Sequence, residues 1–223
     1  MNANEKLCYI LNMTRINWRA ANLLNPLPVV LITSTDTNGK SNVMTAAWTG
    51  TICSDPVMVS VSIRKSRYSH SIISKTKEFV INIPDENLTL FTDYSGIYSG
   101  KKVDKLRQEG KYKVTTTNSQ NVKAVTIDEC PIALECKVRK IVELGSHDMF
   151  IAEVLSCSIR KDCIDKNNKL DLSKAKLISY CHGEYYSLGK KLGKFGFSSS
   201  KKERNRRTDS INQKKRSKKG CYE

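Results

Sequence analysis

The sequence has little that would place the protein in a membrane or an export pathway. Its longest uninterrupted aliphatic run is Val29–Ile32, whereas a membrane-spanning helix needs about 20 apolar residues. Residues 1–18 include Glu5, Lys6 and Arg15 but no apolar core or small-residue cleavage site, so they do not predict a signal peptide. We therefore expect no membrane association and a cytoplasmic location.

Prolines and histidines are also few, with 5 and 3 in the 223 residues. So little proline excludes collagen-like and mucin-like chains, and the histidines form neither the H-x-H nor the H-E-x-x-H pattern of a metal site. The 8 cysteines include no C-x-x-C pair, and a reducing cytoplasm keeps thiols free. The sequence therefore predicts no metal centre and no disulfide framework.

Charge is distributed unevenly along the chain. The 38 Lys and Arg residues exceed the 22 Asp and Glu residues, which gives a net charge of +16. Residues 198–223 hold ten of the basic and three of the acidic side chains. They contain too few apolar residues to offset the ordering of the chain, so we predict a disordered basic tail. The organisation that follows is an N-terminal lead-in at residues 1–23, a domain at residues 24–197 and this tail.

Short β-type segments begin after Pro26-Leu27-Pro28, where proline stops any helix. Val29–Ser34 is β-branched and apolar, residues 36–40 favour a hairpin turn, and Ser41–Thr51 returns as a second strand. Apolar and polar residues alternate along Val57–Ile63, which predicts a third strand with one buried face.

The rest of the domain has two short helical patterns among further strands. Ile72 and Ile73 form one apolar turn of the first helix, and Ser69 or Ser71 is its expected cap. The predicted segments are a helix at Ser69–Lys77, a strand at Phe79–Ile83, a helix at Asp85–Tyr94, and a hairpin of Ile132–Leu144 with Met149–Ile159. Many short strands with few helices predict a mainly β fold, a small barrel with short helices at its ends.

Two stretches carry candidate chemistry, and each has two interpretations. In Asn42–Gly50, small residues would let a flat group approach the backbone; alternatively, the alanines and Trp48 fill a barrel interior. Ser62–His70 places cations and hydroxyls where a strand meets a helix start. Free N–H groups and guanidinium groups bind phosphate there, but a solvated basic turn has the same composition.

Seven motifs follow one another in the predicted domain. They are PVVLIT (28–33), NxxTAxW (42–48), DP (55–56), SIRxxRYSxxI (62–72), FVINIP (79–84), SGxxVDKL (99–106) and YYxLG (185–189). Each is weak alone, but their ordered combination resembles the flavin reductase-like family, in particular its flavoredoxin branch.

The resemblance implies an FMN-binding split barrel, usually a homodimer, and assigns candidate cofactor contacts. Five would line the isoalloxazine ring and ribityl chain: Asn42, Thr45, Ala46, Ala47 and Trp48. Four would hold the phosphate, with Asn82 nearby: Arg64, Arg67, Tyr68 and Ser69. Ser69 stands where the family often has threonine, and Leu106 where it often has phenylalanine, which could loosen the packing beside Lys105.

Lys105 and His182 are the candidate catalytic residues. The resemblance puts Lys105 close to the flavin ring, where a cation would stabilise the charge gained on reduction. It also puts a histidine-containing segment near the flavin, although His182 could instead end a strand. His70 and His147 are interpreted as surface residues.

The function implied is electron or hydride acceptance at FMN. The protein would be an NAD(P)H-dependent flavin reductase, or a flavoredoxin-type carrier that takes electrons from a reduced donor protein. The alternative from another class is a basic nucleic-acid-binding protein, with nucleic acid bound only through the tail.

Overall fold

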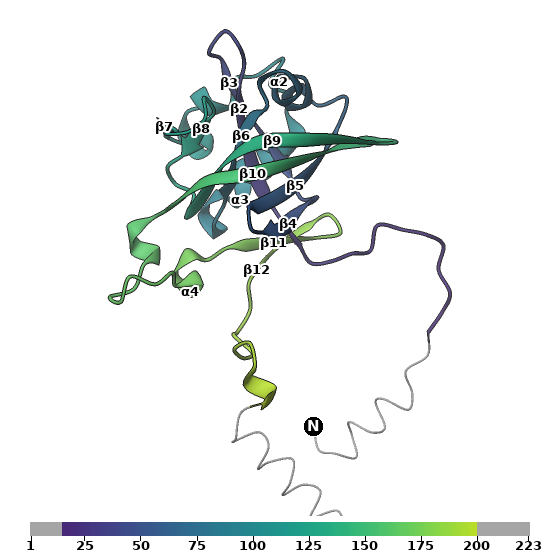
Figure 1. Cartoon of the computed structure of the whole chain (residues 1–223), viewed down its shortest axis with the longest axis vertical. Coiled ribbons are helices and arrows are strands. Elements are labelled where there is room, and N and C mark those ends of the chain that lie inside the picture. Colours follow the sequence, from purple (N-terminus) through teal and green to yellow (C-terminus); the bar gives the residue numbers. More distant parts are fainter. Residues whose placement is uncertain (1–14, 200–223) are drawn as a thin grey trace, which may run out of the picture. The chain divides into compact units, whose positions relative to one another are not determined.

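The computed structural model describes residues 15–199 (Figure 1), and its contacts divide the chain after Leu188. Within the described residues the main sheet has seven strands in the order β3-β2-β6-β9-β10-β5-β4. Their bounds in that order are Ser41–Ala46, Val30–Thr35, Glu78–Ile83, Ile132–Leu144, His147–Ile159, Val57–Arg64 and Thr49–Ser54. In the second unit, the described residues 189–199 contain one 3-10 turn, Phe197–Ser199 (η5).

The main sheet closes into a split barrel. Its two edge strands, β3 and β4, are consecutive in the chain and are separated only by Ala47 and Trp48. β3 pairs with β2, whereas β4 turns away and pairs with β5 on the other side of the barrel. The predicted mainly β barrel is therefore confirmed, but the expected single strand at Ser41–Thr51 is wrong. The strand is interrupted at Ala47 and Trp48, because its two halves pair with different strands at the two edges of the sheet.

Smaller elements surround the barrel. Leu27–Pro28 (β1), Ile178–Cys181 (β11) and Glu184–Ser187 (β12) form a second antiparallel sheet. Thr116–Asn118 (β7) pairs with Val125–Ile127 (β8). The remaining short elements are Glu86–Leu88 (η1), Lys105–Arg107 (η2), Gly110–Tyr112 (η3), Lys161–Cys163 (η4) and Leu172–Ala175 (α4).

Two helices border the candidate site. Tyr68–Thr76 (α2) follows β5 and buries Ile73 in the barrel interior, and Thr89–Ile97 (α3) packs on β2 and β3. The predicted serine cap of α2 is wrong. Arg67 is the N-cap and makes no side-chain cap bond; the hydroxyl of Ser69 instead accepts a hydrogen bond from Asn42.

Two apolar clusters lie on opposite faces of β2. Alternate residues of β5, namely Val59, Val61 and Ile63, point into the barrel interior with Phe79 and Phe150, as the period of two predicts. The second cluster, Leu31, Val43, Leu88, Phe91, Val114, Ile127 and Cys130, lies beneath α3. Burial on both faces explains why β2 reads as a continuous apolar run.

Some predictions lie beyond what the structure tests. The tail from residue 200 onward and residues 1–14 lie outside the described residues, and the boundaries after residues 23 and 197 stay predictions. Along residues 15–199 no helix is long and apolar enough to cross a membrane. No group of three or more His, Cys, Asp or Glu side chains in this same part of the chain could hold a metal ion.

Candidate functional site

Two neighbouring cavities lie between β3, the end of β5 and α3. The first has a volume of about 360 Å³ and the second about 280 Å³. Met44, Arg64 and Arg67 line both, so the two cavities adjoin each other. We call them the ring cleft and the anion cavity after the groups that their linings suit.

The anion cavity is built from buried polar side chains. The Nδ2 amide of Asn42, on β3, donates to Ser69 Oγ at 2.7 Å, and the two side chains are 5% and 1% exposed. Gly100 packs against this pair so closely that a Cβ there would lie 1.9 Å from Asn42 Oδ1. Only glycine permits that approach, which explains the glycine of the SGxxVDKL motif in physical terms.

Uncompensated positive charge characterises the anion cavity. Lys105 is 3% exposed, and its Nζ donates to the carbonyls of Ser95 and Tyr98 at 3.0 and 2.9 Å. Burial, together with the neighbouring Arg67, lowers the pKa of Lys105 to about 8. The lining residues include no Asp or Glu. Such a cavity favours an anion, which would stabilise the protonated lysine.

A buried hydroxyl group in the same cavity is free to form a hydrogen bond with a ligand. Ser95 lines the anion cavity, is 1% exposed, and its Oγ has no hydrogen-bond partner among residues 15–199. Leaving a buried hydroxyl unpaired is costly. A phosphate oxygen would satisfy it, so the lining fits a phosphate group.

The ring cleft has an aromatic wall at its opening. Trp48 is 40% exposed, and its ring centroid lies 4.4 Å from that of His147, at the start of β10. Arg64 is the cross-strand partner of His147. Burial, followed by the charge of Arg64, lowers the pKa of His147, so the imidazole is held neutral at neutral pH. The exposed position of Trp48 contradicts the interpretation that it fills the barrel interior.

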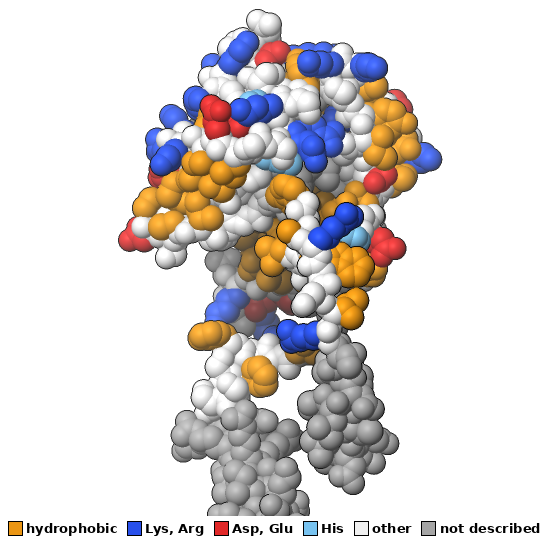
Figure 2. All heavy atoms as spheres, turned by 90° about the vertical axis from the view of Figure 1, so that its right-hand side faces the viewer, with side chains coloured by type: hydrophobic (Ala, Val, Ile, Leu, Met, Phe, Trp, Pro, Cys, Tyr) orange, Lys and Arg blue, Asp and Glu red, His pale blue; other side chains and the backbone are white. Residues whose placement is uncertain are grey.

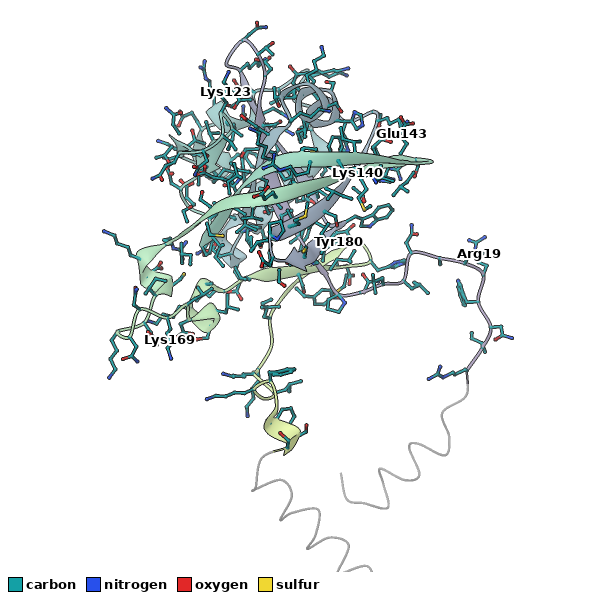
Figure 3. All side chains as sticks on the ribbon, viewed as in Figure 1. Arg19, Lys123, Lys140, Glu143, Lys169 and Tyr180 are labelled. Atoms are coloured by element: carbon teal, nitrogen blue, oxygen red, sulfur yellow. The ribbon has the colours of Figure 1, made fainter. Side chains whose placement is uncertain are left out.

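The opposite wall combines α3 with the second sheet. Asp93 on α3 accepts a hydrogen bond from the hydroxyl of Tyr185 on β12 at 3.1 Å. Tyr180, which Figure 3 shows on β11 beside the barrel, packs edge-on against Tyr185 with a centroid distance of 5.5 Å. Burial and the neighbouring Asp93 raise the pKa of Tyr185, so its hydroxyl remains a donor.

The structure brings ten of the predicted site residues to these two cavities. Thr45, Ala46, Ala47 and Trp48 line the ring cleft; Asn42, Tyr68, Ser69 and Lys105 line the anion cavity; Arg64 and Arg67 line both. Thr45 Oγ1 donates to the carbonyl of Thr92, which ties β3 to α3. Lys105 lies with the phosphate candidates rather than in the ring cleft where the resemblance suggested.

Asn82 and His182 do not lie in either cavity, which corrects their predicted positions. Asn82 is fully buried; its Nδ2 donates to Leu31 O and Thr33 Oγ1, and its Oδ1 accepts from Ile127 N–H. Its hydrogen bonds therefore join β6 to β2 and β8, and both polar atoms of the side chain are used within the protein. His182 is exposed in the β11–β12 turn with φ 49°, and its backbone N–H donates to Asn25 Oδ1.

Sequence reasoning missed other residues of the site. His147, interpreted as a surface residue, lines the ring cleft. His70, the other histidine interpreted as a surface residue, is half-buried outside both cavities, with Nε2 2.8 Å from Asp148 Oδ2. Asp93 and Ser95 lie in the predicted second helix or just after it, but had no motif of their own. Only the pairing of β5 with β10 and the packing of α3 bring these groups to the cavities.

The fold is that of a split-barrel protein, and a cleft with an aromatic wall adjoins a cavity lined by cations in it. The family model described as "Flavin reductase like domain" matches residues 23–189. The chain therefore belongs to the flavin reductase-like family, which supports a flavin-binding oxidoreductase.

Two solved structures agree with this assignment, and the chain is also similar to a curated protein whose description gives no function. A flavoredoxin of Desulfovibrio vulgaris (Miyazaki F) is 30% identical, with a TM-score of 0.77 over 84% of this chain and 100% of its own. A flavoredoxin from Methanosarcina acetivorans is 27% identical, with a TM-score of 0.74 over 84% and 100%. An uncharacterized protein of Archaeoglobus fulgidus is 40% identical over 116 residues, 52% of this chain and 64% of that protein.

Proposed function

We propose that the protein is an FMN-dependent oxidoreductase that accepts electrons or hydride from NAD(P)H or from a reduced carrier protein. The observation that carries the proposal is that a cation-lined cavity and an open cleft lie side by side and share the lining residues Met44, Arg64 and Arg67. FMN has the matching shape, since a flat ring is joined by a short chain to one terminal phosphate. We place the ring in the ring cleft and the phosphate in the anion cavity.

The phosphate contacts follow from the chemistry of the lining. Arg64 and Arg67 supply guanidinium donors, Lys105 an ammonium, and Ser69 and Ser95 hydroxyls. Charge-assisted hydrogen bonds of this kind are the strong ones. FMN is favoured over riboflavin, which has no phosphate, and over FAD, whose phosphate is bridged to a further nucleotide.

Bound FMN supplies the redox chemistry, because its ring accepts an electron pair from a reduced nicotinamide and passes it on. The chain's own residues bind and orient. Trp48 and His147, whose ring planes are tilted by 37°, form an aromatic wall that would exclude water from one side of the ring cleft. Nε2 of the neutral His147 has no partner among the described residues. Arg64 places a cation beside them, which favours a ring that gains electrons.

Absorbance and affinity measurements test the cofactor. The purified protein should show the bands of oxidised flavin or acquire them with FMN. Replacing Arg64 by Ala should weaken FMN binding by about 1.5–3 kcal/mol, whereas Arg139→Ala, which removes an exposed partner of Glu153, should not. No flavin spectrum after addition of FMN would refute the proposal.

Anaerobic stopped-flow distinguishes the two kinds of donor. A reductase should lose the absorbance of oxidised flavin within seconds of mixing with NADH or NADPH. A carrier should stay oxidised with both nucleotides and react with a reduced ferredoxin. The second result would refute NAD(P)H as the electron donor but would leave FMN as the proposed cofactor.

We also propose a homodimer that covers the apolar edge of the barrel. Ile52 on the edge strand β4 is 49% exposed, and Val57 and Leu155 on neighbouring strands are 46% and 37% exposed. Figure 2 shows hydrophobic side chains gathered in patches on one face of the molecule. Exposed edges and apolar patches favour association. Light scattering should give twice the chain mass, and a single-chain mass at micromolar concentration would contradict the dimer.

A further inference from the structure

Asp93 stands apart from the other charged groups of the site. Among the described residues that line the two cavities, it is the single acidic side chain, facing a lining that includes Arg64, Arg67 and Lys105. A phosphate site has no use for a carboxylate. Its presence in the ring cleft calls for a different ligand group, one that donates a hydrogen bond.

The carboxylate is held in place as an acceptor. Tyr185 donates to its Oδ1 at 3.1 Å, while Oδ2 has no hydrogen-bond partner in the described part of the chain. The raised pKa of Tyr185 keeps that donor protonated. Tyr180 packs against the Tyr185 ring and limits its movement. One oxygen is therefore bound by the protein, and the other remains available in the cleft.

The arginines nearby do not neutralise Asp93. In the described part of the chain, neither Arg64 nor Arg67 forms an ion pair with its carboxylate. Arg67 Nη1 instead donates to the carbonyl of Gly96 at 2.9 Å. A carboxylate that only anchored β12 to α3 would need no opening into the cleft. Asp93 lines the cleft although half-buried, which points to a contact with the ligand.

The isoalloxazine ring offers one matching group. Its pyrimidine portion has a single N–H, an imide that lies between two carbonyls, and the rest of the ring edge carries acceptors or methyl groups. We infer that Asp93 accepts a hydrogen bond from this imide N–H and so selects the flavin ring, with Tyr185 as the positioning residue. The inference rests on the proposed function, which places the ring in this cleft.

A flavin methylated at the imide nitrogen tests the contact directly. 3-Methyl-FMN keeps the phosphate and the ring but has no imide N–H. The wild-type protein should bind FMN about 10- to 150-fold more tightly than 3-methyl-FMN, the range for a hydrogen bond to a charged group. In Asp93→Ala and Asp93→Leu the preference should fall below about threefold, while Tyr185→Phe should give an intermediate value.

The controls separate the inference from the proposed function and from misfolding. Glu143→Ala removes an exposed carboxylate that pairs with Lys65 outside both cavities, and it should keep the wild-type preference. Two Asp93 variants guard against one that fails to fold, and each retains the phosphate contacts, so FMN should still bind.

Two results would count against the inference, and a third would count against the proposed function. An equal preference for FMN in wild type and both Asp93 variants would overturn it, as would a change confined to the KM of the electron donor. A wild-type protein that binds neither flavin would refute the proposed function instead.

Discussion

Lys105 makes the anion cavity testable by pH. Its buried ammonium has a pKa lowered to about 8 by burial and by Arg67. A phosphate dianion beside it favours the charged form, so FMN binding raises this pKa, and by linkage FMN binds more weakly where Lys105 is neutral. The phosphate itself does not titrate in this window, because its second pKa is about 6. Affinity should therefore fall as pH rises through 8.

The size of the effect follows from that pKa. One unit above it, about nine-tenths of Lys105 is neutral in the free protein, which predicts about a tenfold loss of FMN affinity between pH 7 and pH 9. Lys105→Met should bind FMN about 10- to 150-fold more weakly at pH 7 and lose this pH dependence. Fluorescence titrations at pH 7, 8 and 9 measure both, with riboflavin as the ligand control. The same pH dependence in Lys105→Met, or with riboflavin, would refute the assignment.

Three further predictions concern a glycine beside the anion cavity, a buried asparagine outside both cavities, and the basic tail. Gly100→Ala should displace Asn42 and weaken FMN binding in titrations, whereas Gly50→Ala, with nothing within 4 Å of its added carbon, should not. Asn82→Ala should lower the free energy of unfolding by about 1–3 kcal/mol, because it leaves the N–H of Ile127 unpaired; unchanged FMN affinity would confirm that it lies outside the site. Deletion of residues 198–223 should leave the flavin content and the thermal midpoint unchanged, and loss of FMN would contradict the predicted boundary.

Local sequence pattern was enough to predict most strands of the main sheet, but not the strands of the two smaller sheets. The alternation along Val57–Ile63 predicts β5, and the two β-rich runs after residue 130 predict the β9–β10 hairpin. Such segments are predictable because each strand carries its own period of two and its own turn residues. The order of the strands in the sheet has no comparable local signal.

The site was predictable where one segment carries it and not where separate segments meet. The residues of Asn42–Trp48 and Arg64–Ser69 came from contiguous motifs, and most of them line the cavities. His147 becomes a site residue only because β10 pairs with β5 and sets it opposite Arg64. Asn82 lies within a family motif, but its contacts with β2 and β8 occupy the whole amide, which one strand cannot reveal.

The interruption between β3 and β4 explains how the segment 41–54 contributes side chains to both the barrel interior and the ring cleft. In an unbroken strand, alternation would put Trp48 on the same face as Met44 and Ala46, and both of those residues belong to the barrel interior. The interior is filled by these side chains, and β4 must leave β3 to pair with β5, from Thr49 opposite Val61 onward. The change of direction after Ala46 turns Trp48 outward, where it meets His147 at 4.4 Å. Composition alone therefore left two interpretations of Trp48, because residues 42–50 have the composition of a core strand. The direction of the Trp48 ring depends on how the barrel closes, which composition does not show.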